Sequence, residues 1–272
     1  SDVDVGDTIT ATITLSTVQI GSFQGHAGQS QFDLTGSAST VTTALQALRY
    51  VPTPNRVAPG QTESFTATLE VHDASAGVSP GNSTTTVTVT SIADAPSVAM
   101  EFVWSTRDDQ VGFPLYPLVI NDPDADASSQ TYELRLLTSP YGHYDPASVP
   151  SSRVDPDGSI VITNYTRDQI ISPTLDTVRF VPEANVGGNY SGGDLRQLGI
   201  VVTDSHGSTI TSSVPLRIVP VNDLPNIAGI PPNLVRVNDD ATVRPFDKIL
   251  ISDVDETGTQ HVSVTISFAV GT

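Results

Sequence analysis

Residues 121–137, NDPDADASSQTYELRLL, decide the fold of this chain. They join an Asp-x-Asp loop, Asp122-Pro123-Asp124, to the segment Tyr132–Leu137, in which apolar and polar side chains alternate up to Leu136. Such alternation is typical of a β-strand with one buried face. The stretch therefore predicts a strand that the chain enters through an acidic loop.

The same loop and strand occur on both sides of this stretch. Ser1–Asp4 leads into Thr8–Leu15, and Ser252–Asp255 leads into Val262–Phe268. The three loops start at residues 1, 121 and 252, so the spacings are 121 − 1 = 120 and 252 − 121 = 131 residues. A period of this size corresponds to one domain per repeat.

Further landmarks recur in the same order within each period. They are a short segment ending in Val-Pro, a strand running into an Asp-containing loop, and a linker ending in Pro. In sequence these are Leu48–Pro52 with Val178–Pro182, Phe65–Val71 with Gln197–Val202, the loops at Asp73 and Asp204, and the linkers Ala93–Pro96 and Asn222–Pro225.

The repeats predict domains at residues 1–96, 97–225 and 226–272. Short alternating strands and 20 Gly and 20 Pro at turns predict an all-β fold of tandem, elongated immunoglobulin-like antiparallel β-sandwiches with Greek-key connections. Helical signal is confined to one or two turns at Thr42–Leu48 and at the matching Thr166–Ile171.

The outer two domains are expected to be incomplete. The first lacks its opening strands, and the third stops soon after its Asp-x-Asp strand. We expect the third piece to be marginal unless it swaps, pairs with a neighbour or completes the first piece of another chain. An opening on Ser1-Asp2-Val3-Asp4 rather than Met predicts an internal fragment of a longer protein.

Composition excludes some classes of partner. The net charge of -18 makes nucleic acid a poor partner, because phosphate backbones are repelled. No apolar run approaches the ~20 residues of a membrane span, so no membrane insertion is expected. Among the 30 acids 24 are Asp, a residue that favours turns and cation ligation, and there is no Cys.

The Asp residues should converge where domains meet, because alternate loops of an immunoglobulin-like sandwich gather at one end. Clustered carboxylates repel one another, and Ca²⁺ with about six to eight oxygen ligands relieves the repulsion. The alternative is turn-forming Asp without an ion. The predicted ligands are Asp94, Asp108, Asp109, Asp122, Asp124 and Asp204 at the first junction, Asp223, Asp239, Asp240, Asp253 and Asp255 at the second, and Asp2, Asp4 and Asp73 at an incomplete site.

Together these motifs resemble the cadherin-like tandem repeats of large bacterial surface proteins. The resemblance rests on Asp122-Pro123-Asp124, on Thr203-Asp204-Ser205 before the last strand, and on the linker Val221–Pro225. It implies cadherin-type sandwiches with calcium between them. The chain departs from the family at Ala47–Pro54, where an acidic Leu-Asp-Arg-Glu motif is missing, and at Ala93, where the family has Asn, so fewer ions per junction are expected.

Two Asp-rich stretches have local explanations. Asp122–Asp126 with Glu133 imitates the start of a calcium-binding EF-hand loop, but Ala127 stands where the required Gly should be. Asp155-Pro156-Asp157-Gly158 predicts a hairpin turn, because Pro presets φ and Gly accepts a left-handed conformation. A separate metal site is the alternative for the second stretch.

No motif for catalysis is present, so the chain is not expected to be an enzyme. The five His residues lack metal-ligand spacing, and no nucleophile elbow or phosphate loop occurs. Trp104, Tyr141 and Tyr144 could belong to a sugar-binding face or to the core.

The sequence thus predicts a calcium-stiffened structural or adhesive stalk of an extracellular or cell-surface protein. Its partners would be neighbouring repeats of the same chain, with cell-surface or matrix glycans or homophilic contacts as further candidates. The alternatives are a carbohydrate- or homophilic-binding module, or a non-catalytic accessory region of a secreted hydrolase.

Overall fold

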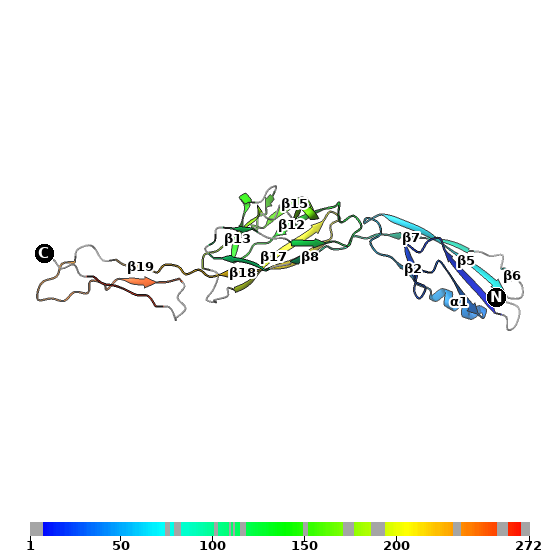
Figure 1. Cartoon of the computed structure of the whole chain (residues 1–272), viewed down its shortest axis with the longest axis horizontal. Helices are drawn as coiled ribbons and strands as arrows, with labels where there is room; N and C mark the ends of the chain where they lie inside the picture. Colours follow the sequence, from blue (N-terminus) through cyan, green and yellow to red (C-terminus); the bar gives the residue numbers. More distant parts are fainter. Residues whose placement is uncertain are drawn as a thin grey trace.

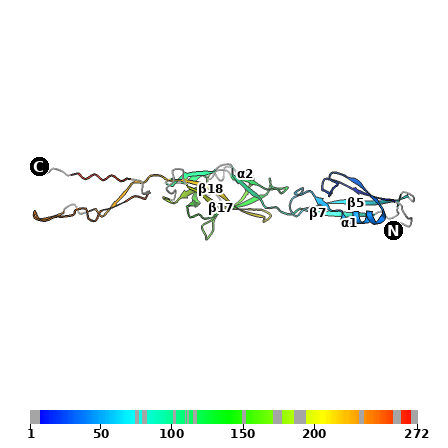
Figure 2. The same ribbon diagram turned by 90° about the horizontal axis from the view of Figure 1, so that it is seen from below.

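A computed structural model describes residues 8–73, 77–78, 83–100, 103–108, 110, 112–114, 118–148, 152–170, 177–185, 194–230, 235–254 and 261–267. The protein is all-β and elongated, with its parts strung along one axis in both views (Figures 1 and 2). We call them the N-terminal unit (residues 8–96), the central unit (97–225) and the C-terminal segment (226–267). No helix within the described ranges is long and apolar enough to cross a bilayer.

The N-terminal unit is built on one antiparallel sheet in the order β3-β1-β5, with β6 and β7 both paired to β5. A β2–β4 ladder and helix α1 complete the unit. Its strands and helix are β1 (Ile9–Leu15), β2 (Gly21–Phe23), β3 (Gln31–Gly36), α1 (Ala38–Ala47), β4 (Tyr50–Pro52), β5 (Thr62–Asp73), β6 (Gly77–Val78) and β7 (Ser83–Thr90).

Helix α1 is longer than the sequence predicted. Ser37 caps its first turn, because the Ser37 hydroxyl accepts from the backbone N–H of Thr40 at 3.3 Å. The hydroxyls of Thr42 and Thr43 donate to the backbone carbonyl oxygens of the residues four positions earlier. These local bonds satisfy polar groups at the start of the helix and add a turn that apolar periodicity does not reveal.

The central unit is a sandwich of two layers. One layer is the six-stranded sheet β14-β15-β12-β17-β18-β9, and the other contains the ladders β8–β11 and β10-β16-β13. The elements are β8 (Ser97–Met100), β9 (Trp104–Arg107), β10 (Phe113–Pro114), β11 (Leu118–Asn121), β12 (Thr131–Leu136), β13 (Gly142–Asp145), η1 (Pro146–Ser148), β14 (Ser152–Val154), β15 (Ile160–Thr166), α2 (Arg167–Gln169), β16 (Arg179–Pro182), β17 (Asp194–Asp204) and β18 (Thr209–Val219).

The core of the central unit lies between the two layers and draws side chains from both. Leu134 of β12 and Ile200 of β17 face Ile120 of β11 and Phe180 of β16, and all four are fully buried. The alternation of apolar and polar residues at 132–136 is therefore the inward and outward alternation of β12, whose residues are buried at every second position. The hairpin predicted at Asp155–Gly158 is confirmed, since β14 pairs with β15 across it.

Of the two interpretations of Trp104, Tyr141 and Tyr144, a sugar-binding face or the core, the structure supports the core. Trp104 and Tyr144 are only 4% and 5% exposed and belong to the core. Tyr141 packs against that core, and the Arg196 guanidinium lies 4.9 Å from its ring centroid. Rings that stack on a sugar must be accessible, whereas Trp104 and Tyr144 are covered and Tyr141 is half-buried.

The C-terminal segment forms one small ladder, β19 (Asn226–Ala228) with β20 (Leu250–Ser252). The strand predicted at Val262–Phe268 is absent from residues 262–267, and Phe268 lies outside the described residues. Val262, Val264 and Ile266 are 44%, 58% and 54% exposed. Alternating residues form a strand only where a partner strand and a core cover them, and the described part of this segment supplies neither.

Candidate metal centre

The Asp-x-Asp loop joins β11 to β12, and its own side chains hold its shape. The backbone N–H of Asp124 donates to Asp122 Oδ1 at 2.9 Å. The other oxygen, Oδ2, accepts from Gln130 Nε2 at 2.6 Å and from the Tyr132 hydroxyl at 3.0 Å. The loop is therefore rigid, and it is no EF-hand, because Glu133 lies in β12 opposite Thr203.

The turn between β17 and β18 places a second carboxylate beside this loop. Asp204 Oδ1 accepts from the backbone N–H groups of His206 and Ser208, both at 2.8 Å. These bonds fix one Asp204 oxygen in the turn and leave Oδ2 for other partners.

The linker from the N-terminal unit arrives at the same place. The backbone N–H of Asp94 donates to Asp124 Oδ1 at 3.2 Å. Three regions that are distant in sequence thus meet: the linker, the Asp-x-Asp loop and the β17–β18 turn. The sequence predicted this meeting for Asp94, Asp122, Asp124 and Asp204.

Asp122, Asp124 and Asp204 form an acidic cluster, in which one ligand oxygen from each residue lies within 4.8 Å of the others. Asp124 and Asp204 are each only 5% exposed, and the Oδ2 atoms of both are buried without a hydrogen-bond partner. Burial raises the pKa of Asp124, and the neighbouring carboxylates Asp122, Asp204 and Asp94 raise it further, against the bond from the Asp94 N–H.

The donor set fits a hard divalent cation. A buried carboxylate oxygen without a partner is costly, and two of them in one cluster repel each other. Carboxylate oxygens are the ligands that Ca²⁺ prefers, so the site has the chemistry a calcium ion requires. Within the described residues this is the only group of three or more acidic or His side chains close enough to hold a metal.

A His–Asp pair borders the acidic cluster. His206 Nε2 lies 2.9 Å from Asp126 Oδ2, and this bond raises the pKa of His206, with smaller contributions from Asp204 and Asp124. Asp126 Oδ1 is buried without a partner. The sequence drew attention to Asp126 only as part of the Asp122–Asp126 stretch, and it gave no reason to include His206, Gln130 or Tyr132, because the role of these three depends on how the loops fold.

Without metal, the stability of the central unit should fall as pH rises above the ordinary pKa of Asp, about 4, and fall again above that of His, about 6.5. The folded state raises the pKa of both Asp124 and His206, so it binds more protons than the unfolded chain in these two ranges. Thermal melting in chelator at several pH values checks this, and His206→Gln should flatten the upper part of the decline. A melting temperature that rises across the two ranges would contradict it.

Asp108 is not at the first junction, so that part of the prediction was wrong. It follows β9, which runs parallel to β18, and Asp108 Oδ1 accepts from the backbone N–H of Val221 at 2.9 Å. This bond places Asp108 beside the second linker, at the opposite end of the central unit, where it is only 4% exposed. Its structural neighbours are the residues that lead to Asp223.

Among the described residues, none of the other predicted ligands belongs to a group of three that could hold a metal. Asp73 lies at the end of β5 opposite Ile9 and Gly77, and Asp239 and Asp240 are exposed. The convergence at the second junction, with Asp223 and Asp253, stays a prediction. The residues outside the described ranges are Asp2, Asp4, Asp109 and Asp255.

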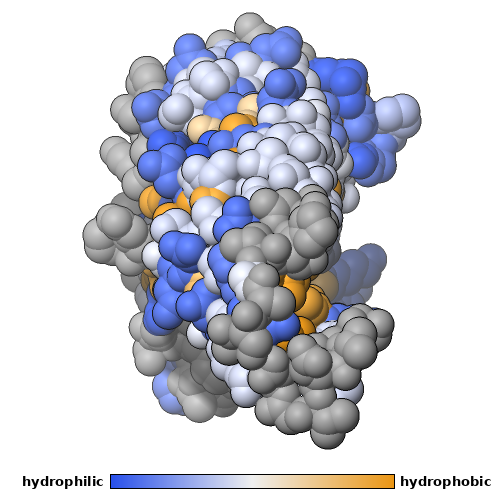
Figure 3. All heavy atoms as spheres, turned by 90° about the vertical axis from the view of Figure 1, so that its right-hand side faces the viewer, coloured by the Kyte–Doolittle hydropathy of each residue, from blue (hydrophilic) through white to orange (hydrophobic). Residues whose placement is uncertain are grey.

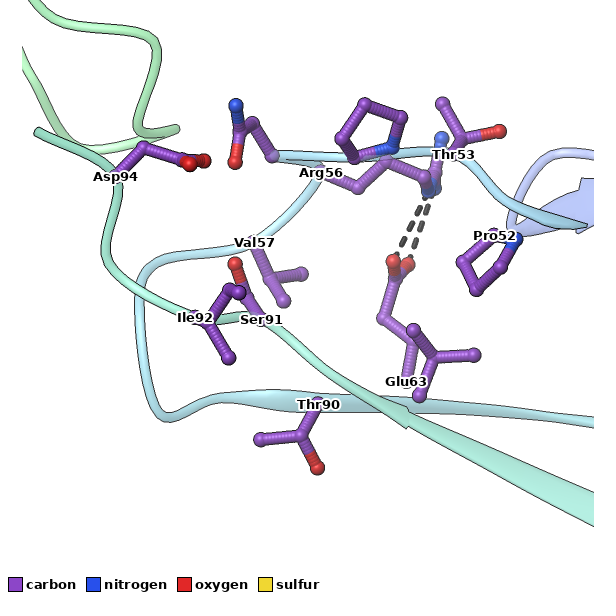
Figure 4. A pocket seen from close by; sticks show the side chains of 12 residues that line it. Pro52, Thr53, Arg56, Val57, Glu63, Thr90, Ser91, Ile92 and Asp94 are labelled. Carbon is purple, nitrogen blue, oxygen red and sulfur yellow. Dashed lines mark hydrogen bonds and ion pairs between the residues drawn. The ribbon is translucent and has the colours of Figure 1, made fainter.

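A cavity of about 280 Å³ lies on the N-terminal unit where the linker leaves it, and it is lined by residues 52–57, Glu63, residues 89–92 and Asp94 (Figure 4). Arg56 spans it and binds Glu63 with both ends of its guanidinium, Nε to Oε2 at 2.9 Å and Nη2 to Oε1 at 3.0 Å. The pair ties the loop after β4 to β5, on the same cavity that Asp94 lines.

The fold and this centre define an all-β protein of sandwich repeats with a buried acidic centre where a linker meets the next repeat. No protein-family model matches the chain, and no curated protein matches it either.

Several solved structures show a distant likeness. Extracellular cadherin domains 1–5 of protocadherin gamma B2 share 14% identity over 81% of this chain and 34% of that chain, with a TM-score of 0.32. Domains EC21–23 of human CDH23 share 14% identity over 71% of this chain and 55% of that chain, with a TM-score of 0.29. Domains EC1–2 of human mucin-like protocadherin share 17% identity over 78% of this chain and 85% of that chain, with a TM-score of 0.29. The chain spans about a third of the first structure and about half of the second. Because the TM-scores are this low, the likeness carries no argument about function.

Proposed function

We propose that this chain is a calcium-stiffened structural module of an extracellular or cell-surface protein. The observation that carries the proposal is the pair of buried, partnerless oxygens, Asp124 Oδ2 and Asp204 Oδ2, beside the point where the linker residue Asp94 is held. A cation there would tie the linker to the central unit, because its ligands would come from both.

Asp122, Asp124 and Asp204 would hold the ion, with Asp94 as the ligand from the linker. Bound calcium would supply positive charge that offsets the repulsion among these carboxylates. The protein's own contribution is to keep the oxygens in place: Tyr132 and Gln130 hold Asp122, and the β17–β18 turn holds Asp204.

An extracellular location is part of the proposal, because a weak calcium site is filled only where the ion is abundant. Extracellular modules bind Ca²⁺ at about 10⁻⁴–10⁻³ M, a concentration that cytosol does not reach. The role is mechanical. With the metal, the linker would be tied to the central unit and successive repeats would stay in line. Without it, the linker would still be held by the 3.2 Å bond from the Asp94 N–H to Asp124 Oδ1, a weaker tie than a shared ion.

Calcium titration tests the proposal. The melting temperature should rise between micromolar and about 10 mM Ca²⁺. At about 100 times the dissociation constant, calcium should add about 2.7 kcal/mol to the free energy of unfolding. Small-angle scattering in chelator should show a broader distribution of maximum dimensions than in calcium. An unchanged melting temperature together with identical scattering curves would refute the proposal.

A further inference from the structure

The acidic cluster is assembled from two loops of the central unit, and one buried side chain outside the cluster touches both of them. We infer that Gln130 is a positioning residue of this cation site: its amide holds the Asp-x-Asp loop against the β17–β18 turn and so sets the spacing between Asp122 and Asp204. The inference rests on the proposed function and deepens it, because it names a residue on which the affinity of the site for calcium depends.

The register of the strands brings Gln130 to the turn. β12 and β17 pair antiparallel with Tyr132 opposite Asp204, so the residues just before β12 and just after β17 meet at the end of the ladder. The backbone N–H of Gln130 donates to the Asp126 carbonyl oxygen at 3.0 Å, which closes the loop ahead of β12. The Gln130 side chain is only 6% exposed, because it is enclosed between the loop and the turn.

Both ends of the Gln130 amide are used. Nε2 donates to Asp122 Oδ2 at 2.6 Å, and Oε1 accepts from the Ser205 hydroxyl at 3.2 Å. An ionised carboxylate can only accept, so the amide nitrogen must face Asp122, and this directs the amide oxygen to Ser205. One planar group thus joins the loop that carries Asp122 to the turn that carries Asp204.

The position requires an amide of this length. A glutamate at residue 130 would have no donor for Asp122 and would set a second carboxylate against it. A methionine would fill a similar volume but would make neither hydrogen bond. The neighbours of Gln130, a carboxylate on one side and a hydroxyl on the other, therefore explain why glutamine stands here.

A second contact joins the turn to the loop beside the first. His206 of the turn lies with Nε2 at 2.9 Å from Oδ2 of Asp126 in the loop. The contacts Ser205–Gln130 and His206–Asp126 do not use the carboxylates of the acidic cluster, so neither depends on a bound ion. Loop and turn are therefore assembled by the protein itself, and the linker is the part that calcium would have to fix.

This assembly should raise the affinity for calcium. A ligand that is already held does not have to be ordered when the ion binds, so less of the binding free energy is lost. Removing a residue that orients a metal ligand typically weakens metal binding about 10–100-fold. Gln130 orients Asp122 directly, and it fixes the turn of Asp204 through Ser205.

Calorimetric titration of the intact chain with calcium tests the inference. Gln130→Met should weaken binding about tenfold or more, because the volume is kept and both hydrogen bonds are lost. Ser205→Ala should weaken it about threefold, the size expected for one neutral hydrogen bond, and Ser205 is exposed, so this variant leaves no cavity. In the Gln130→Met background, Ser205→Ala should have no further effect, because Ser205 acts through Gln130.

Gln46→Met is the matched control, because Gln46 is exposed in α1 of the N-terminal unit. The N-terminal end of the molecule, which faces the viewer in Figure 3, is mainly hydrophilic, with small hydrophobic areas between polar side chains. One added methionine on this unit should therefore be tolerated. The calcium affinity of the control should equal that of the parent.

Terbium in place of calcium gives a readout that a loss of stability alone would not change. The luminescence lifetimes of bound Tb³⁺ in H₂O and in D₂O report the number of water molecules on the ion. Gln130→Met should raise this number, because an Asp122 that is no longer held leaves a coordination position to water. A variant that is only destabilised, but folded at the temperature of the measurement, should keep the number of the parent.

The outcomes separate this inference from the proposed function. A parent chain that binds neither calcium nor terbium would refute both. If the parent binds calcium and Gln130→Met has the same affinity and the same number of bound waters, the role of Gln130 alone is overturned. A Ser205→Ala loss that persists undiminished in the Gln130→Met background would also overturn it, because Ser205 would then act by another route.

Discussion

Replacing Phe180 by alanine should destabilise the central unit by about 3–5 kcal/mol, the range for removing a fully buried aromatic ring. Phe180 is 0% exposed and makes an edge-to-face contact with Tyr144, with ring centroids 5.2 Å apart. Its strand, β16, lies between β10 and β13, so the cavity left by the ring opens in the middle of a layer. Packed strands on both sides limit how far the site can collapse.

Urea unfolding monitored by tryptophan fluorescence measures this loss of stability in the central unit. Trp104 is the only tryptophan of the chain, it is 4% exposed, and it lies in β9 of the central unit. Val181→Ala, at the next position on the opposite face of β16, is the matched control and should cost about 1 kcal/mol or less. A Phe180→Ala loss no larger than that of the control would mean that the two layers do not share one core.

The same substitution at the matching position of the N-terminal unit should cost less. Tyr50 is half-buried, so Tyr50→Ala removes a smaller buried area than Phe180→Ala does. The difference between the two losses of stability therefore reports the difference in burial of the two rings.

Strand positions could be predicted from the sequence wherever one face of a strand is buried. The alternation of residues 8–15 and 132–137 became β1 and β12 because each lies inside a sheet. The same alternation at 262–267 did not become a strand. Periodicity reports which residues a strand would bury, but it carries no information on whether a partner is there to bury them.

The candidate metal centre was predictable in its carboxylates but not in its supporting residues. Asp-x-Asp spacing and the linker Asp94 can be read along the chain. The bonds from Gln130 and Tyr132 to Asp122 require the loop to fold back on itself. Asp108 was misplaced for a related reason: it lies close to Asp122 in sequence, but β9 ends at the far end of the unit, and β11 returns before the loop begins.

Replacing Asp124 by asparagine should have opposite effects with and without calcium, and this reversal is the sharpest test of the metal centre. In chelator the variant should be at least as stable as the parent, because it removes one of several buried, mutually repelling carboxylates. Asparagine retains Oδ1, which can still accept from the Asp94 N–H. Its amide nitrogen would occupy the place of the partnerless Oδ2 and could donate to a neighbouring carboxylate.

In millimolar calcium the order should reverse, because asparagine removes a charged ligand and places a donor where the ion needs an acceptor. The parent gains about 2.7 kcal/mol at about 100 times its dissociation constant, and the variant should gain little of it. Melting curves of both proteins, with and without calcium, give all four values. Asp168→Asn, at a carboxylate that is 87% exposed, is the control and should follow the parent in both conditions. If Asp124→Asn lowers stability equally in chelator and in calcium, Asp124 holds the loop by hydrogen bonding alone and the cluster is a set of turn residues without a metal.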